Sequence, residues 1–254
     1  MTLPDKKIVL ITGGNQGVGY ETAKNLILSS QDYHVILGSR DAAKGEAAAK
    51  ELQAAEGIKG STSSIQIDVT DDESVDAAAS RITSEYGRLD ILINNAGIAS
   101  MTKPPTRTAF RRILETNVVG ALSVTEAFLP LLREAIHKPP RLVFVSSSMG
   151  SITHASNPDS PYYAPGGATE YRTSKAALNM LIALYYARLK PEGFYVFGAD
   201  PGLCATNFTG NPAALRQRGA AEAWQGGERV ATVVKGEKDA DVGRVLGEYG
   251  VSPW

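Results

Sequence analysis

The sequence predicts a single α/β domain in which a mostly parallel, doubly wound sheet of seven strands carries helices on both faces. Short apolar runs alternate with helical stretches along the 254 residues, as is typical of successive βαβ units. A glycine-rich loop follows the first apolar run, as in folds that bind dinucleotides. No repeat, linker or shift in composition marks a boundary, so we expect one domain over residues 1–254.

The first apolar run, 8–11, predicts a buried strand, and a helix is predicted to about Leu28. Between them, Thr12–Gly19 has the spacing Gly-x-x-x-Gly-x-Gly. Glycine lets the backbone approach an anion closely, and a helix N-terminus offers free N–H groups to phosphate. A tight turn or helix cap is the alternative, but the position after the first strand favours a Rossmann-type nucleotide site. The expected cofactor contacts here are Gly13, Asn15, Gln16, Gly17, Val18 and Gly19.

The second strand, 33–39, is followed by Arg40, where an NAD site normally carries Asp or Glu for the ribose hydroxyl. Arginine can bind a 2′-phosphate through two parallel hydrogen bonds, whereas a carboxylate would repel it. Lys44, in the helix predicted over 42–56, would add charge. These residues favour NADP(H) over NAD(H). The alternative is that both cations only solvate a helix start.

Two further strands add candidate cofactor contacts at their C-terminal ends. The third strand, 64–69, ends with Asp68 and Val69, and Asp68 suits the adenine edge. The fourth, 89–94, runs into Asn94-Asn95-Ala96-Gly97, whose small residues would let a cofactor lie against the backbone. We expect Asn94, Ala96 and Gly97 to contact it.

The middle of the chain combines a long helix with an irregular segment. Asn117 lies in the centre of the helix predicted over 106–136, where its poor propensity indicates a local irregularity or a function. The fifth strand, 141–146, ends in three consecutive serines, Ser146–Ser148. The segment 151–169 is rich in Pro, Gly, Ser and Tyr, and a loop of this length is usually functional or disordered.

A helix from Tyr171 to Leu189 is predicted by a run that lacks Gly and Pro and is rich in Ala and Leu. The run is apolar nearly all round, so we expect burial on most faces. Tyr171 and Lys175 lie four residues apart and therefore on one side. An ammonium group favours a nearby phenolate, so we expect a lowered pKa for Tyr171 and proton transfer near neutral pH. A surface Tyr–Lys pair is the alternative on spacing alone.

The last part of the chain predicts a sixth strand at 193–199 followed by Pro201-Gly202. A mobile flap at 207–221, a helix at 222–234 and a seventh strand at 244–249 complete it. Right-handed crossovers would bring the glycine loop and the ends of strands four, five and six to one edge of the sheet, where ligands bind in open α/β folds.

Composition excludes several classes of protein. A net charge of -1 provides no basic field for nucleic acid or an anionic membrane. The single cysteine, Cys204, excludes an internal disulfide, and neither a signal-peptide pattern nor a membrane-spanning run is present, so we expect a cytoplasmic protein. His34, His137 and His154 are scattered, so no metal site is expected. The absence of a Gly-x-Ser-x-Gly elbow argues against a serine hydrolase.

Together these motifs resemble the short-chain dehydrogenase/reductase family over nearly the whole chain. The motifs that carry the resemblance, in the family's order, are the glycine loop, Asn94-Asn95-Ala96-Gly97, Asn117, Ser147, Tyr171 with Lys175, and Pro201-Gly202. The stretch 38–45 and the lengthened segment before Tyr171 are similar to the NADPH-dependent carbonyl reductase branch.

The resemblance implies a role for each motif. Tyr171 would be the general acid, Lys175 would lower its pKa and bind the nicotinamide ribose, and Ser147 would hydrogen-bond the substrate oxygen. Asn117 would hold a water that links Lys175 to solvent. The other implied cofactor contacts are Arg40, Lys44 and Asn15 at the 2′-phosphate, Asp68 and Val69 at the adenine, Thr206 at the carboxamide, and Pro201 and Gly202 in the family's Pro-Gly motif.

Two features depart from the family pattern. Alignment on Gly150 selects Ser147, while Ser146 and Ser148 stay as alternatives for the serine role. The segment between Ser147 and Tyr171 is longer than the family's usual spacing. This insertion would line the substrate pocket or block the interface that many relatives use, so a monomer and a homo-oligomer both stay open.

The sequence therefore predicts an NADPH-dependent reductase of a ketone or aldehyde carbonyl. One alternative is an NADP-dependent alcohol dehydrogenase working in the oxidative direction, or a 3-oxoacyl reductase. Another is a non-catalytic NADP-binding regulator, which would be free to lose Tyr171. The expected partner is a small-molecule carbonyl or alcohol, with neither nucleic acid nor membrane involved.

Overall fold

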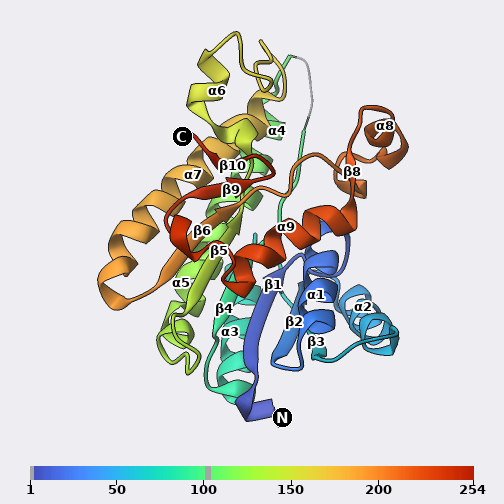
Figure 1. Cartoon of the computed structure of the whole chain (residues 1–254), viewed down its shortest axis with the longest axis vertical. Helices are drawn as coiled ribbons and strands as arrows, with labels where there is room; N and C mark the ends of the chain where they lie inside the picture. The colour runs from blue at the N-terminus through green and yellow to red at the C-terminus, as the bar shows by residue number, and fades with distance from the viewer. Residues whose placement is uncertain (1–2, 101–103) are drawn as a thin grey trace.

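A single eight-stranded sheet forms the centre of the computed structural model, which describes residues 3–100 and 104–254 (Figure 1). The strand order is β10-β9-β6-β5-β4-β1-β2-β3, and every pair is parallel except β9 with β10. The strands are β1 (Lys7–Thr12), β2 (Tyr33–Ser39), β3 (Ser61–Gln66), β4 (Ile91–Asn94), β5 (Arg141–Val145), β6 (Tyr195–Ala199), β9 (Val245–Gly247) and β10 (Gly250–Ser252). Two short strands, β7 (Cys204–Ala205) and β8 (Ala221–Glu222), pair separately.

Helices cover both faces of the sheet, as the sequence predicts. Helices α1 (Gly17–Ser29), α2 (Ala42–Ala54) and α9 (Ala223–Lys235) contribute to the buried cluster on one face. Helices α3 (Asp72–Tyr86), α5 (Gly120–Arg133) and α7 (Thr169–Leu189) contribute to the cluster on the other. The shorter helices are α4 (Arg107–Leu114), α6 (Ile152–Ser156) and α8 (Pro212–Gln217).

The continuous apolar run of β1 follows from its central place in this three-layer arrangement. Val9 and Leu10 are both fully buried, but they belong to opposite clusters because successive side chains of a strand point to opposite faces. A strand covered on both faces therefore needs apolar residues at every position rather than at alternate ones.

Three elements differ from the sequence prediction. The expected seventh strand, 244–249, is shorter, as β9, and an eighth strand that was not predicted, β10, follows it in an antiparallel hairpin, where Gly250 takes a left-handed φ of 97° that favours glycine. Strand β3 ends at Gln66, so Asp68 and Val69 lie in the loop beyond it. On α7, Met180 and Leu184 are 61% and 58% exposed, so the predicted burial is wrong for this side, because the helix packs on the sheet along only one face.

The insertion and the predicted flap project at the end of the molecule opposite the N-terminus (Figure 1). The insertion holds α6, and Ser151 caps this helix by accepting a hydrogen bond from the backbone N–H of His154. The flap holds α8, which Asn211 caps through the N–H of Ala214. Both segments thus contain regular structure with specific helix caps.

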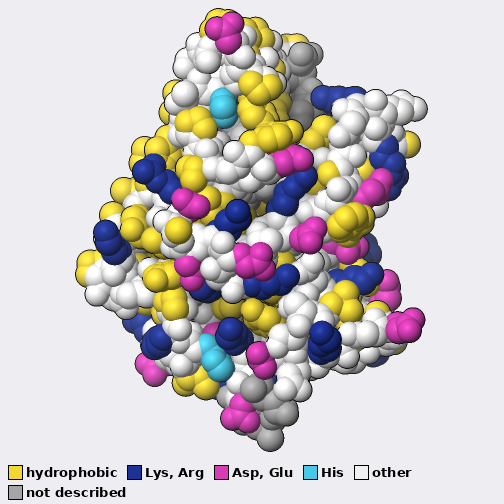
Figure 2. Space-filling model, in the orientation of Figure 1, with side chains coloured by type: hydrophobic (Ala, Val, Ile, Leu, Met, Phe, Trp, Pro, Cys, Tyr) yellow, Lys and Arg dark blue, Asp and Glu magenta, His cyan; other side chains and the backbone are white. Residues whose placement is uncertain are grey.

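The surface is of mixed charge. On the face shown in Figure 2, acidic and basic side chains are interspersed, as expected for a chain of net charge -1. Within 3–100 and 104–254, none of the helices has the length and apolar character required to cross a bilayer.

Candidate active site

One large cavity, of about 1420 Å³, opens at the carboxyl ends of the central strands. This is the edge at which open α/β sheets bind ligands, and the volume exceeds that of a typical drug-sized site. The structure brings most of the predicted site residues into its lining. These are Gly13, Asn15, Gln16, Gly17, Val18, Arg40, Asp68, Val69, Ala96, Gly97, Ser147, Tyr171, Lys175, Pro201, Gly202 and Thr206.

Four predicted site residues lie outside this lining: Gly19, Lys44, Asn94 and Asn117. Gly19 faces the Asn95 amide, and a Cβ there would lie 2.4 Å from Nδ2, so the residue must be small for packing. Asn94 is buried and donates a hydrogen bond to Thr125 Oγ1 over 2.9 Å. Both residues support the cavity wall from behind.

The glycine loop has the features that a dinucleotide phosphate requires. Gly13 and Gly17 have φ values of 63° and 59°, in the left-handed region that favours glycine. A Cβ on Gly17 would extend toward Thr206, 3.6 Å away, across the cavity. Gln16, the N-cap of α1, makes no side-chain capping bond, so its side chain does not cover the helix N-terminus that faces the cavity.

Asn95 is a cavity residue that the sequence analysis placed in a motif but not in the site. Its side-chain amide donates to the carbonyl oxygens of Thr12 and Gly13 over 2.8 and 3.1 Å. Thr12 Oγ1 in turn accepts from the N–H groups of Asn95 and Ala96. These bonds fix the glycine loop against the end of β4. The Asn-Asn-Ala-Gly motif was the available signal, but it did not show which asparagine faces inward.

The three serines after β5 have different environments, which distinguishes among them. Ser146 is buried and also lines the cavity, but its Oγ donates to Asn179 Oδ1 over 2.5 Å. Ser147 lines the cavity, accepts from the N–H of Met149 over 3.2 Å, and hydrogen-bonds Tyr171. Ser148 contributes no part of the lining. Of the three, Ser147 is therefore the serine placed to act with Tyr171.

The serine turn, residues 146–150, packs tightly on α7. A Cβ on Gly150 would lie 2.6 Å from the backbone of Lys175, so only glycine permits this approach. Lys175 is 5% exposed, and its Nζ donates to the carbonyl oxygen of Val145 over 2.7 Å. Its Nζ also lies 5.7 Å from the centroid of the Tyr171 ring. The Tyr–Lys pair is thus part of the cavity wall and not a surface pair.

The expected lowering of the Tyr171 pKa is wrong for the protein alone. Burial and the Asp200 carboxylate raise the pKa of Tyr171, while its hydrogen bond with Ser147 lowers it. Burial also lowers the pKa of Lys175 to about 8, against the opposing effect of Asp200. Loss of water at a buried site disfavours both charged forms, and here it outweighs the attraction between ammonium and phenolate. Tyr171 is therefore a neutral phenol at neutral pH.

Asn117 lies in a short π-helical turn, residues 115–119, between α4 and α5, so the predicted local irregularity is present. Its Oδ1 accepts from the N–H of Ile98 over 2.8 Å, and its Nδ2 donates to Ile98 O and Ser174 Oγ. Both amide hydrogens are used in these bonds. The side chain therefore ties the loop after β4 to α7, on which Tyr171 and Lys175 are carried.

The two predicted phosphate-binding cations lie in different places. Arg40 is exposed and lines the cavity. Lys44 lies 3.7 Å from Asp41 Oδ2 on the exposed side of α2, and it is not part of the lining. Asp41 caps α2 by accepting from the N–H of Lys44 over 3.1 Å. Of the two predicted cations, Arg40 is therefore the one that lines the cavity.

Three large hydrophobic side chains also line the cavity. Leu203, Phe208 and Tyr249 line it and are 48%, 42% and 85% exposed, respectively. The Phe208 ring packs edge-on to the Tyr171 ring, with centroids 5.9 Å apart. Tyr162 of the insertion also lines the cavity. Sequence reasoning missed Leu203 and Tyr249, and their only signal was position in a loop after a strand.

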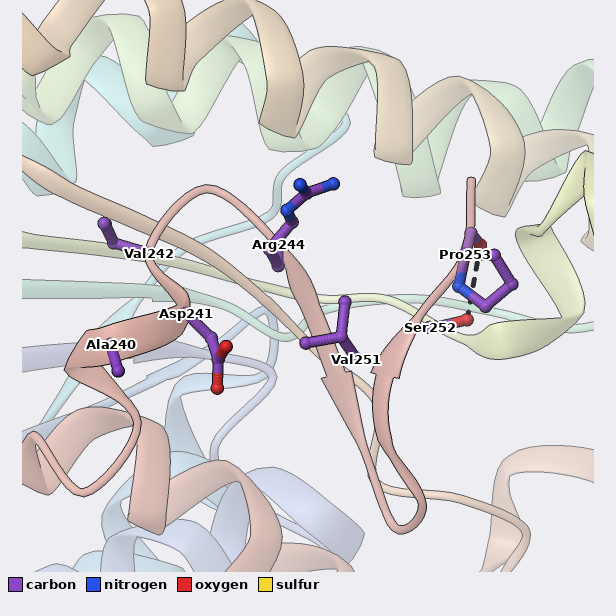
Figure 3. A pocket seen from close by; sticks show the side chains of 7 residues that line it. All are labelled: Ala240, Asp241, Val242, Arg244, Val251, Ser252 and Pro253. Carbon is purple, nitrogen blue, oxygen red and sulfur yellow. Dashed lines mark hydrogen bonds between the residues drawn. The ribbon is translucent and has the colours of Figure 1, made fainter.

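A second hollow lies at the edge of the sheet beside the β9–β10 hairpin (Figure 3). It is lined by seven residues, among which Asp241 and Arg244 are the only charged ones. None of the predicted site residues takes part. Nor do His, Cys, Asp and Glu side chains in 3–100 and 104–254 form any group of three able to hold a metal ion. The large cavity is therefore the candidate active site.

A Rossmann-like sheet with a glycine loop, a serine and a Tyr–Lys pair at one cavity defines an oxidoreductase of the nicotinamide-dependent class. The short chain dehydrogenase family model matches residues 7–216. The chain belongs to this short-chain dehydrogenase/reductase family.

Curated relatives agree with this assignment. The short-chain dehydrogenase/reductase tropE of Talaromyces stipitatus is 40% identical over 261 residues, covering 97% of each chain. The short-chain dehydrogenase/reductase eupG of a Phoma species is 35% identical over 272 residues, covering 98% of each. Among solved structures, NADPH-bound carbonyl reductase from chicken fatty liver has a TM-score of 0.81 at 26% identity, covering 98% of this chain and 94% of that one.

Proposed function

We propose that this chain is an NADPH-dependent reductase that reduces a ketone or aldehyde carbonyl, with Tyr171 as the proton donor. The observation that carries the proposal is the meeting of Ser147, Tyr171 and Lys175 with the glycine loop in one cavity. Bound NADPH would supply the hydride.

The protein's part in the reaction is to hold and move a proton. Tyr171 is a neutral phenol, and it can pass its proton to an oxygen that becomes an alkoxide as reduction proceeds. The Ser147 hydroxyl would hydrogen-bond the same oxygen and stabilise the developing charge. Lys175, with a pKa of about 8, keeps a positive charge near neutral pH that would stabilise the phenolate left behind.

The residues present fit a phosphorylated dinucleotide. The two glycines of left-handed φ and the uncovered start of α1 suit a pyrophosphate. Arg40 lines the cavity just beyond β2, where a 2′-phosphate would favour a guanidinium group over a carboxylate. The relative with bound NADPH supports the same choice of cofactor.

The test is turnover of a panel of ketones and aldehydes, followed by loss of NADPH absorbance and identification of the alcohol product. We expect alcohol formation in amounts equal to the NADPH consumed. Tight NADPH binding without turnover of any carbonyl would instead favour the regulator. Faster oxidation of alcohols with NADP⁺ at neutral pH would favour a dehydrogenase in the oxidative direction.

A further inference from the structure

Asp200 is a buried carboxylate that hydrogen-bonds two segments of the candidate active site, the serine turn and the Pro201-Gly202 loop. It follows β6 directly, is 5% exposed, and lines the cavity. Its backbone N–H donates to the carbonyl oxygen of Leu246 over 2.7 Å, so the edge of the sheet fixes its main chain.

The two carboxylate oxygens of Asp200 reach in different directions. Oδ2 accepts from the backbone N–H of Ser148 over 2.6 Å, within the serine turn that carries Ser147. Oδ1 accepts from the backbone N–H of Gly202 over 2.9 Å. Gly202 lies in a predicted cofactor-binding loop and has a φ of 77°. One side chain therefore holds two separate segments of the cavity wall.

We propose that Asp200 is a positioning residue that sets the serine turn against the Pro201-Gly202 loop, and so fixes Ser147 relative to Tyr171 and to the bound dinucleotide. This inference rests on the reductase function proposed above. Short hydrogen bonds to a charged acceptor are among the stronger ones in proteins, and burial makes their loss costly. A displacement of about 1 Å at a reacting group is enough to lower a rate substantially.

Asp200 also supplies the negative charge in a site whose other groups are sensitive to it. Its charge raises the pKa of Tyr171 and opposes the lowering of the Lys175 pKa by burial. The ionisable groups around it come from five segments: Tyr171 and Lys175 on α7, Tyr162 on the insertion, Cys204 on β7, Arg229 on α9, and Glu248 in the β9–β10 turn.

The neighbouring ion pair of Arg229 and Glu248 does not replace the Asp200 charge. Arg229 Nη1 donates to the carbonyl oxygen of Pro201 over 2.7 Å, and Nη2 lies 2.9 Å from Glu248 Oε1. Arg229 thus holds the outer side of the same loop with its own carboxylate partner. Removal of the Asp200 charge would leave the buried Lys175 ammonium less stabilised.

The principal test compares Asp200→Asn with wild type. The asparagine side-chain oxygen can accept from one of the two N–H groups, of Ser148 or Gly202. Its NH2 group then faces the other N–H and cannot accept from it. We expect kcat to fall about 30-fold, which corresponds to about 2 kcal/mol. We expect NADPH affinity to change less than threefold, about 0.7 kcal/mol. We also expect the alkaline limb of the kcat/KM profile to move about one pH unit lower, because Lys175 loses the nearby negative charge of Asp200, which raises its pKa.

Asp90→Asn is the matched control. Asp90 is also fully buried and accepts backbone N–H groups, from Ile8, Ile136 and His137, but at the other end of the sheet. The control should keep the wild-type kcat and the wild-type pH profile. An equal change in both variants would show that any buried aspartate has this effect, and the proposal would fail.

Ser148→Pro separates the hydrogen bond from the charge. Proline removes the N–H that Asp200 accepts, along with the Ser148 hydroxyl, while the Asp200 charge stays in place, and Ser147 has the extended backbone that a residue before proline prefers. This variant should lower kcat while the alkaline limb stays in place. It also tests the link if Asp200→Asn does not fold. A wild-type kcat in folded Ser148→Pro would overturn the positioning role.

A readout independent of turnover distinguishes this proposal from the proposed function. Amide exchange of the peptide covering 146–150 should become about tenfold faster in Asp200→Asn, and unchanged in Asp90→Asn, because a buried N–H loses its acceptor. Faster exchange in Asp200→Asn, combined with a wild-type protein that reduces no carbonyl, would reject the reductase and keep the structural link. Unchanged exchange together with unchanged kcat in folded Asp200→Asn would reject the positioning role alone.

Discussion

At each end of the parallel sheet a buried aspartate accepts hydrogen bonds from backbone N–H groups, but the residues around the two aspartates differ. At the amino ends of the strands, Asp90 accepts three backbone N–H groups and lies 3.4 Å from Arg88 Nε. At the carboxyl ends, Asp200 accepts two, but its neighbours are the groups of the cavity, Tyr171 and Lys175. A buried carboxylate therefore tells little about function until the residues around it are known.

The comparison predicts that substitutions at the carboxyl ends change catalysis and substitutions at the amino ends change stability. Parallel strands place all their carboxyl ends at one edge, so loops there can vary in chemistry while the opposite edge maintains the fold. The predictions below test this division, beginning with the largest expected effect.

Tyr171→Phe removes one hydroxyl at the carboxyl ends of the strands. We expect kcat for carbonyl reduction to fall about 1000-fold, because the variant lacks the phenol that hydrogen-bonds Ser147 and would donate the proton. NADPH affinity and the melting temperature should stay close to wild type. Turnover, fluorescence titration and thermal unfolding measure the three quantities. Activity within tenfold of wild type would exclude Tyr171 as the proton donor.

Arg40→Asp places a carboxylate where a 2′-phosphate is expected. The Kd for NADPH should rise about 100-fold, through loss of a charge-assisted hydrogen bond and new repulsion. The Kd for NADH should change much less. Calorimetric titration of both cofactors gives the two values. Lys44→Asp is a matched control with a smaller expected effect, because Lys44 lies beside Asp41 outside the cavity lining. Equal losses for NADPH and NADH would show that Arg40 does not contact the phosphate.

The pH dependence of the wild-type enzyme should report Lys175. Its pKa of about 8 in the folded protein means that the ammonium form dominates below this pH and is lost above it. We expect kcat/KM for reduction to fall about tenfold per pH unit above pH 8. An alkaline limb that begins near pH 10 would show that the Lys175 charge is not required.

His34, on β2, tests the opposite end of the sheet. Burial and the nearby Lys6 charge lower the pKa of His34 to about 4, and its ring nitrogens contact Ser61 and Ser63. An unfolded histidine binds a proton near pH 6.5. Between these pH values the unfolded state binds more protons, so about 3 kcal/mol of stability is lost as pH falls from 6.5 to 4.

His34→Gln should remove this part of the acid sensitivity without changing kcat. Urea unfolding at several pH values measures the loss, and the partly exposed His137 provides the control variant His137→Gln. An unchanged slope of stability against pH in His34→Gln would show that the proton uptake belongs to another group.

The smallest effect is expected from shortening the insertion between residues 157 and 167. Tyr162 lines the cavity, so the KM for bulky carbonyls should rise severalfold, which corresponds to about 1 kcal/mol of binding free energy. NADPH affinity should stay unchanged, because the glycine loop is not touched. An unchanged KM across a substrate panel would show that the insertion takes no part in substrate binding.

Much of this arrangement is predictable from local sequence. The glycine spacing, the short apolar strands and the Tyr–Lys pair are each contained within a few residues, and parallel topology determines that they meet. Arg40 is also predictable from local sequence, because its position directly after a strand places it at the cavity edge.

Features that depend on long-range packing were not predictable. The pKa of Tyr171 moves opposite to the expected direction because burial depends on surrounding segments, and four-residue spacing gives no measure of it. Lys44 lies outside the cavity lining, with its ammonium group 3.7 Å from Asp41, the residue that caps its helix. The link through Asp200 depends on backbone N–H groups at Ser148 and Gly202, whose directions no side-chain pattern records.

The most direct test of the account is a structure with NADPH and a trapped carbonyl compound. The measured quantities are the distances from the carbonyl oxygen to Tyr171 Oη and to Ser147 Oγ. The account predicts that both lie in hydrogen-bond range, about 2.6–3.2 Å. A carbonyl oxygen that contacts neither hydroxyl, with the Tyr171 hydroxyl directed into bulk water, would contradict it.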